Sequence, residues 1–227
     1  MSTIAERLSR VRARISRAEQ DYGRPAGSVQ LLAVSKTKPV SAILAAIEAG
    51  QRAFGENYLQ DALPKQEALA GQPIAWHFIG PIQSNKTKAI AASFDWVHSL
   101  EREKIARRLN DQRPDNLAPL NICLQVNVSG EASKAGLEPG SVQALADVVA
   151  GLPRLRLRGL MCIPAPARDL DAQRRPFRQL RELQETLLAN GLAVDTLSMG
   201  MSGDLEAAVA EGSTLVRVGT DIFGARD

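Results

Sequence analysis

Short apolar segments alternate with longer amphipathic segments along nearly the whole chain. The apolar segments have the length of strands, and several are apolar at almost every position, as strands covered on both faces are. Such strands are expected at residues 31–36, 52–55, 74–79, 96–99, 120–128, 155–161, 196–198 and 215–219. Between them, apolar residues recur every three or four positions, which predicts helices.

The predicted helices have their own start signals. Thr3 and Glu6 have the spacing of a capping box, which opens a helix at the beginning of the chain. Ser202 precedes the last clear helical stripe, where a serine commonly caps the first turn. The helices in between are expected at residues 40–49, 58–69, 83–92, 101–109, 142–149 and 177–190.

Eight strands, each followed by a helix, within 227 residues predict an α/β fold of the (β/α)8 TIM-barrel type. An open, doubly wound parallel sheet has the same alternation and stays the alternative. No linker or shift in composition divides the chain, so we expect one domain over residues 1–227. Neither a G-x-G-x-x-G fingerprint nor a Walker A loop occurs, which speaks against nucleotide binding.

Charge and composition narrow the class of protein further. Lys and Arg outnumber Asp and Glu by 28 to 25, and a net charge of +3 gives no reason to expect nucleic acid as a partner. Arginines cluster on the first helix, among them Arg14 and Arg17, and again at residues 174–181; we interpret both clusters as solvated helix faces. The two cysteines lie in apolar segments, and the two histidines lack zinc-ligand spacing.

Targeting signals are not evident. No apolar run reaches membrane-spanning length. The N-terminus lacks the apolar core of a secretory signal, and its acidic residues argue against a transit peptide. We therefore expect a soluble, cytoplasmic protein without a membrane or nucleic-acid partner.

The most informative single residue is Lys36, which ends the first apolar run. A lysine at the end of a buried strand is partly desolvated, and desolvation favours the neutral amine that attacks a carbonyl group. Lys36 is therefore a candidate for a Schiff base, although a strand that simply reaches the surface would leave the same pattern. In a closed barrel the first strand neighbours the eighth, which carries Arg217, and function collects at the C-terminal ends of the strands.

Glycine-rich loops follow the seventh and eighth strands, where barrels commonly bind phosphate. Gly200, Gly203 and Gly219 allow the backbone to approach an anion, and Ser202 and Thr220 add hydroxyl donors. Two ordinary turns would account for the same residues. Combined with a Schiff-base lysine, a phosphate site describes pyridoxal 5′-phosphate (PLP).

Arg217 bears on the chemistry of such a cofactor. Many PLP enzymes place a carboxylate against the pyridine nitrogen and keep that nitrogen protonated. An arginine would leave the nitrogen unprotonated and make the ring a weaker electron sink, which favours racemisation or no reaction over transamination. A surface salt bridge is the alternative use of Arg217.

Several ordered motifs make the chain resemble a known family. They are AVSKT (33–37), FGENY (54–58), WHFIG (76–80), QSNK (83–86), GLM (159–161), LSMGMS (197–202), VRVG (216–219) and IFG (222–224). The chain closely resembles the pyridoxal phosphate homeostasis proteins of the YggS/PROSC type from about residue 31 to residue 224. The resemblance implies a barrel like the N-terminal domain of alanine racemase, with PLP held as an aldimine on Lys36.

The resemblance also implies roles for further residues. Arg217 would face the pyridine nitrogen, and Asn57 would lie near the ring. The residues implied at the phosphate are Ser202, Gly219 and Thr220, with Ser198 and Met199 nearby. In the long loop after the fifth strand, Lys134 also fits the family pattern. We predict there a second, transient amine for loading or releasing PLP, and unchanged PLP transfer in Lys134→Ala would contradict it.

Two classes of function remain open: a PLP carrier or regulator of vitamin B6 and amino-acid pools, and a PLP-dependent amino-acid racemase. A two-base racemase needs a second acid or base opposite the lysine. In the resembling racemases this group is a tyrosine from an additional domain, whereas three residues follow Gly224 here, and Tyr22 and Tyr58 are the chain's two tyrosines. We expect a binding protein without its own reaction, a monomer with PLP-dependent apoenzymes as recipients. The roles of His77 and Tyr58 stay open.

Overall fold

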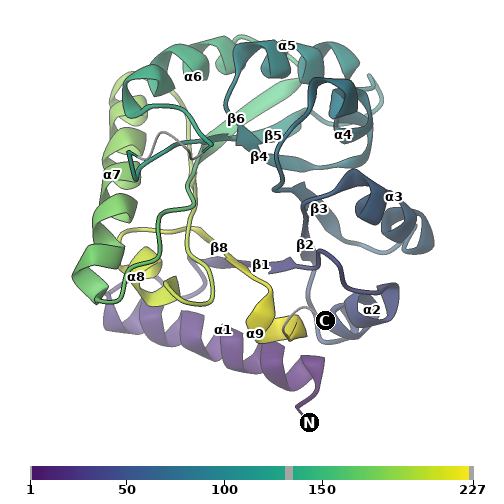
Figure 1. The fold of residues 1–227 in the computed structure, drawn as a ribbon, viewed down its shortest axis with the longest axis vertical. Helices are drawn as coiled ribbons and strands as arrows, with labels where there is room; N and C mark the ends of the chain where they lie inside the picture. Colours follow the sequence, from purple (N-terminus) through teal and green to yellow (C-terminus); the bar gives the residue numbers. More distant parts are fainter. Residues whose placement is uncertain (1, 131–134, 225–227) are drawn as a thin grey trace.

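A computed structural model describes residues 2–130 and 135–224 of the chain. Its parallel strands are β1 (Gln30–Val34), β2 (Ala53–Glu56), β3 (Ala75–Phe78), β4 (Trp96–Leu100), β5 (Leu120–Gln125), β6 (Leu155–Met161), β7 (Thr196–Ser198) and β8 (Leu215–Val218). They form one closed barrel in chain order, surrounded by helices (Figure 1). Because β1 pairs with both β2 and β8, the ring is closed. The predicted TIM barrel is confirmed, and the open sheet is wrong.

Helices follow the strands in the predicted order. They are α1 (Ile4–Asp21), α2 (Val40–Glu48), α3 (Leu59–Ala68), α4 (Thr87–Ser93), α5 (Glu103–Gln112), α6 (Val142–Ala150), α7 (Leu170–Ala189), α8 (Leu205–Ala210) and α9 (Thr220–Phe223), with 3₁₀ turns η1 (Ser84–Lys86) and η2 (Pro139–Ser141). In the described part of the chain, no helix is both long and apolar enough to cross a membrane.

The first helix, α1, precedes the first strand and lies outside the β8–β1 part of the ring, beside α8 and α9 (Figure 1). Its predicted capping box is present: Thr3 Oγ1 accepts from the Glu6 backbone N–H at 3.2 Å, and the Glu6 carboxylate accepts from the Thr3 N–H at 2.8 Å. Leu8, Val11 and Ile15 are buried, so this face packs on the barrel. The helix therefore covers the seam where the barrel closes.

Helix starts elsewhere differ from the predicted caps. Asp204, not Ser202, is the N-cap of α8 by its backbone conformation, and it makes no side-chain bond to the first turn. Its carboxylate instead accepts from the Met201 N–H in the preceding loop at 2.6 Å. Helix α7 begins seven residues before its predicted apolar stripe, since the Asp169 side chain accepts from the Ala172 N–H at 2.8 Å and caps it there. Ser202 is thereby left in the loop between β7 and α8.

Outward-facing side chains of the strands pack against the helices, whereas the barrel interior is partly polar. His98 of β4 hydrogen-bonds Ser198 of β7 at 2.8 Å. Since these strands are not neighbours in the ring, the contact crosses the interior. Both side chains are fully buried. The interior below the C-terminal mouth therefore holds a polar chain rather than aliphatic layers alone.

Candidate functional site

Lys36 lies at the C-terminal mouth of the barrel, two residues beyond the end of β1. Its side chain is half-buried and lines a cavity of about 290 Å³. The same cavity is lined by the predicted site residues Asn57, Ser202, Arg217, Gly219 and Thr220. The fold thus brings six predicted residues, from four different strand ends, to one cavity.

Two further predicted residues, Ser198 and Met199, lie behind this cavity rather than along it. Ser198 is fully buried beneath Arg217 and hydrogen-bonds its guanidinium. Met199 is fully buried in the hydrophobic core. Its backbone N–H donates to the Leu215 carbonyl, and its carbonyl accepts from the Ser213 hydroxyl. Ser198 can therefore act on a ligand through Arg217, whereas the Met199 side chain points into the packing.

The backbone at Lys36 is held in a tight turn. Thr37 has φ +64°, and no other residue except glycine has a positive φ in the described part of the chain. A left-handed conformation costs a threonine about 1–2 kcal/mol, so neighbouring contacts must maintain it. The Lys38 N–H donates to the Ser35 carbonyl at 3.0 Å and closes the turn.

A buried ion pair lies behind the turn. Lys65 of α3 donates to Glu56 Oε1 at 2.8 Å and to the Ser35 carbonyl at 3.0 Å. The Ser35 hydroxyl donates to the same carboxylate oxygen at 2.6 Å. Burial raises the pKa of the Glu56 carboxyl, and the bonds from Lys65 and Ser35 oppose this shift. The residue before Lys36 is thus fixed from both its backbone and its side chain.

Arg217 is buried at the bottom of the cavity. Nη1 donates to the carbonyl of Ser198 at 2.5 Å and to its hydroxyl at 2.8 Å, and Nη2 donates to the Cys162 carbonyl at 2.8 Å. Among the described residues, no carboxylate pairs with Arg217 and none of them accepts from its Nε. Burial lowers the pKa of this guanidinium. An unpaired buried cation favours a ligand that is anionic or an acceptor.

A chain of hydrogen bonds continues from Arg217 into the barrel. His98 Nδ1 lies 2.8 Å from Ser198 Oγ, and His98 Nε2 lies 2.9 Å from His77 Nδ1. Because Arg217 only donates, Ser198 Oγ accepts there and gives its own hydrogen to His98 Nδ1. His98 then carries its proton on Nε2 and donates to His77.

Both histidines are neutral in this chain. Burial lowers the pKa of His77 to about 3. Burial first, and then the neighbouring His77 and Arg217, lower the pKa of His98 well below 6.5. Arg217 therefore keeps a neutral, oriented neighbour below it, which leaves one positive charge at the bottom of the cavity.

The β7–α8 loop, residues 199–204, lines the cavity with Met201, Ser202 and Gly203. Within the described part of the chain, the N–H groups of Ser202 and Gly203 donate to no protein acceptor. Gly200 has φ +98°, and a Cβ there would lie 2.5 Å from Ala208 Cβ. A Cβ on Gly219 would lie 3.1 Å from the Val34 carbonyl. Helices α8 and α9 have six and four residues, so the loop N–H groups and hydroxyls matter here more than helix dipoles.

Asn57, which follows β2, also lines the cavity. Its Oδ1 is buried and has no hydrogen-bond partner. A buried acceptor without a donor is costly and marks a place where a ligand or water completes the bonding. The Asn57 backbone also packs so closely on Gly80 that a Cβ there would lie 2.0 Å from the Asn57 carbonyl oxygen.

Sequence comparisons identify the family of this chain. A sequence model of the alanine racemase N-terminal domain matches residues 7–227. The pyridoxal phosphate homeostasis protein of Pseudomonas aeruginosa is 62% identical over 227 residues, which cover 100% of this chain and 97% of that protein. The protein of the same name from Escherichia coli is 52% identical over 230 residues and covers 100% and 98%. The chain belongs to the pyridoxal phosphate homeostasis protein family.

Solved structures agree with this family and with its fold. PipY of Synechococcus elongatus with PLP bound matches with a TM-score of 0.86 and 38% identity, over 98% of this chain and all of PipY. An alanine racemase from Corynebacterium glutamicum matches with a TM-score of 0.70 and 14% identity, over 96% of this chain and 61% of the racemase. The second likeness concerns the fold alone.

The other residues considered from the sequence lie outside the Lys36 cavity or outside the described part of the chain. Tyr58 is half-exposed and lines a separate groove beside Asn57, and Tyr22 caps α1 under Arg174. Neither tyrosine lines the Lys36 cavity. His77 is buried in the barrel interior, where it belongs to the hydrogen-bond chain that runs from Arg217 through Ser198 and His98. Lys134 lies outside the described residues.

The sequence did not indicate three features around the site: the ion pair of Glu56 with Lys65, the hydrogen bond of His98 to Ser198, and the hydrogen bond of Arg14 to the Ser202 carbonyl. The face of His98 could have been predicted from its position in β4: it lies two residues after Trp96, and side chains two residues apart on a strand point to the same face. Lys65 carries no such signal, because a lysine on a helix is ordinarily solvated.

Proposed function

We propose that this protein binds PLP in the Lys36 cavity and acts in the homeostasis of that cofactor. The observation that carries the proposal is the cavity itself: an amine, Lys36, and a buried, unpaired guanidinium, Arg217, share it with glycine-rich loops. PLP offers an aldehyde for the amine, a pyridine nitrogen that accepts, and a phosphate. The orphaned acceptor on Asn57 fits a bound group at the same place.

We assign each residue one contact. Lys36 holds PLP covalently as a Schiff base. The Nε–H of Arg217 faces the pyridine nitrogen, and Ser198 with His98 keeps the guanidinium in place. When bound, PLP supplies an electron sink, and a nitrogen that only accepts from arginine makes this sink weak.

The phosphate end of the ligand belongs to the loops of β7 and β8. The Ser202 and Thr220 hydroxyls and the N–H groups of Ser202 and Gly203 are its donors, and Gly219 leaves room for it. Asn57 lies beside the ring. Met199 has no direct contact in this assignment and supports the loop by packing.

The relatives support a role in homeostasis rather than in a reaction. Those in Pseudomonas aeruginosa and Escherichia coli are named for PLP homeostasis, and PipY carries PLP. By the same reasoning, residues 1–227 work as one cytoplasmic PLP-binding unit, a monomer that affects amino-acid pools by supplying PLP-dependent apoenzymes.

Borohydride trapping tests the proposal. The protein incubated with PLP should turn yellow, and reduction should fix the added mass on the peptide that contains Lys36. Lys36→Ala should abolish the label, whereas Lys104→Ala, which removes an exposed lysine on α5, should leave it unchanged. A label on another lysine, or none at all, would contradict the proposal.

The position of the two tyrosines favours binding over racemisation, because a two-base mechanism needs a second acid or base at the ligand and neither tyrosine lines the Lys36 cavity. Incubation of free amino acids with the PLP-loaded protein in heavy water checks this. We expect no exchange of the α-proton. Clear exchange that disappears in Lys36→Ala would establish the racemase instead.

A further inference from the structure

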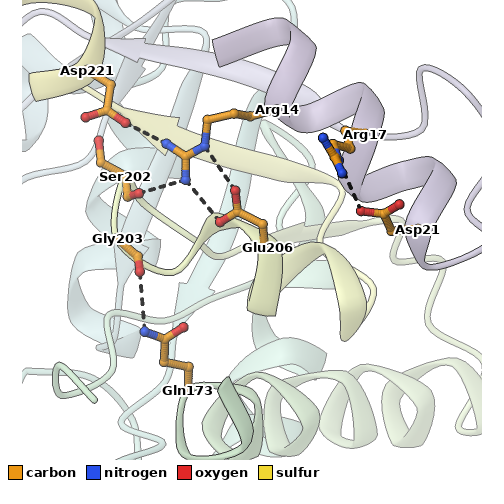
Figure 2. A network of polar contacts seen from close by, with 8 residues as sticks. All are labelled: Arg14, Arg17, Asp21, Gln173, Ser202, Gly203, Glu206 and Asp221. Atoms are coloured by element: carbon orange, nitrogen blue, oxygen red, sulfur yellow. Dashed lines mark hydrogen bonds and ion pairs between the residues drawn. The ribbon is translucent and has the colours of Figure 1, made fainter. Parts of the chain in front are cut away.

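Arg14 of α1 joins the two loops that line one side of the Lys36 cavity (Figure 2). Its Nε and Nη2 bind both carboxylate oxygens of Glu206 at 3.0 Å each, and its Nη1 binds Asp221 at 2.7 Å. Its Nη2 also donates to the Ser202 carbonyl at 3.1 Å. Glu206 lies in α8 and Asp221 in α9, directly after Thr220. One guanidinium therefore connects the loop after β7 with the loop after β8.

The contact with Ser202 bears on the direction of the loop donors. Arg14 holds the Ser202 carbonyl on the outer side of the loop, toward α1, while Ser202 itself lines the cavity. Gln173 of α7 holds the next carbonyl, that of Gly203, at 3.3 Å (Figure 2). Both carbonyls are thus held by side chains of α1 and α7, while the N–H groups of Ser202 and Gly203, two residues that line the cavity, donate to no other described residue.

The geometry suits an arginine rather than any other cation. A planar guanidinium presents its donors in a fixed fork, so it can bind one carboxylate through two nitrogens and still reach two other acceptors. The Arg14 side chain is 35% exposed and those of Glu206 and Asp221 are 46% and 35% exposed, so solvent weakens the charge attraction without removing it. Its orienting effect depends on the hydrogen-bond directions.

The geometry points to Arg14 as a positioning residue for phosphate recognition: a clamp, from a helix outside the eight strand–helix units, that holds the Ser202 and Thr220 loops in register. The inference rests on the proposed PLP site and specifies its selectivity. Arg14 touches no ligand in this arrangement. It fixes the groups that do, so the clamp favours phosphorylated over unphosphorylated pyridoxal.

Comparison of PLP with pyridoxal, which has the same aldehyde and ring but no phosphate, tests the clamp in the full-length protein. Arg14→Ala should weaken PLP binding about tenfold, the effect of losing oriented hydrogen bonds to a charged group. Pyridoxal binding should change by less than about twofold. Arg14→Lys keeps the charge but loses the planar fork, so most of the PLP affinity should disappear there too.

Arg17→Ala is the matched control on the same helix. Arg17 pairs with Asp21 at 3.7 Å on an exposed face (Figure 2), and its removal should change neither affinity. Equal losses for PLP and pyridoxal in Arg14→Ala would overturn the inference, because they would show a general effect on the fold. Full PLP affinity in Arg14→Lys would overturn it as well. Should Arg14→Ala fail to fold, Asp221→Asn must shift the same PLP-to-pyridoxal ratio, and an unchanged ratio refutes the clamp.

Inorganic phosphate separates this inference from the proposed function. Phosphate should raise the melting temperature of the wild-type protein and raise it less in Arg14→Ala. If PLP left Lys36 unlabelled while this difference persisted, the PLP assignment would fail and the clamp would stand. If neither PLP nor phosphate bound the wild type, both would be refuted.

Discussion

Replacing Lys65 by methionine tests how the turn at Lys36 is held. The substitution keeps the length of the side chain but removes the ammonium that lies 2.8 Å from Glu56 Oε1 and 3.0 Å from the Ser35 carbonyl. The Glu56 side chain is 0% exposed, and its Oε2 has no partner even in the intact protein. After the change, the Ser35 hydroxyl is the one donor that the described residues still offer to this carboxylate.

Removing one partner of a buried ion pair costs about 3–5 kcal/mol, because the other charge stays buried without compensation. We expect a loss of this size at pH 7.5. The loss is limited by proton uptake, since burial already raises the pKa of Glu56 above 4.5 and the loss of Lys65 raises it further. A raised folded-state pKa means that the folded protein binds more protons than the unfolded one. The deficit should therefore shrink as the pH falls toward 4.5.

Urea denaturation followed by circular dichroism at pH 7.5, 6.5 and 5.5 measures both effects. Glu56→Gln combined with Lys65→Met should recover most of the loss at pH 7.5, because no uncompensated charge remains. Arg107→Met is a matched control: Arg107 pairs with Glu103 at 2.7 Å, but both side chains are more than half exposed, so its loss should cost under about 1 kcal/mol. A cost below about 1 kcal/mol for Lys65→Met, independent of pH, would refute the buried pair.

Two further predictions concern the interior and the β7–α8 loop. His77 and His98 are neutral in the fold and charge only on unfolding, so stability should fall as the pH drops below 6.5, by about 1.4 kcal/mol per pH unit for each histidine that stays neutral in the fold. For His77 this loss continues toward pH 3. His98→Gln should reduce the slope in urea titrations. Gly200→Ala should lower stability by about 1–3 kcal/mol, because its Cβ would lie 2.5 Å from Ala208 Cβ and φ is +98°. Gly203→Ala is the control in the same assay and should have little effect, because nothing lies within 4 Å of a Cβ there. Equal effects of the two substitutions would contradict the clash at Gly200.

The fold was predictable because its signals are local. Strands of a buried parallel sheet are apolar throughout, their helices carry a 3.6-residue stripe, and eight such units are the number in a TIM barrel. An open sheet fits the same pattern and is excluded by the pairing of β1 with β8. Once the barrel is accepted, strand-end positions are neighbours in space, so Lys36 and Arg217 could be paired without coordinates. The error at Ser202 was local as well: two residues suited to capping, Ser202 and Asp204, stand two positions apart, and the helix begins after the second of them.

The support behind the site was not predictable, because it depends on register and side-chain reach. Glu56 and Lys65 meet because one is the last residue of a short strand and the other lies on the buried face of α3. Arg14 reaches Glu206 across 192 positions of sequence. We interpreted the arginines of α1 as a solvated face, which holds for the 83% exposed Arg17 and is wrong for Arg14. The same error applies to Arg174, which binds the buried Glu211 at 2.7 Å.

The charges around the cavity favour one kind of ligand. Among the described residues, Arg217 has no carboxylate within ion-pair distance. Three acids near the site are bound by other cations, Glu56 by Lys65, and Glu206 and Asp221 by Arg14. Asp204 is not, and its charge interacts with that of Arg217. Neutralising the first three acids outside the cavity leaves its interior positive. An anion bound there gains the attraction of Arg217, and Asp204, whose pKa is raised chiefly by burial, is the one competing carboxylate among these four acids. Arg14 and an anionic ligand in the cavity both act on the β7–α8 loop. Because such coupling is reciprocal, ligand binding stabilises the contact of α1 with this loop by the same free energy by which that contact stabilises ligand binding. An anionic ligand therefore also strengthens the closure of the barrel, which α1 covers.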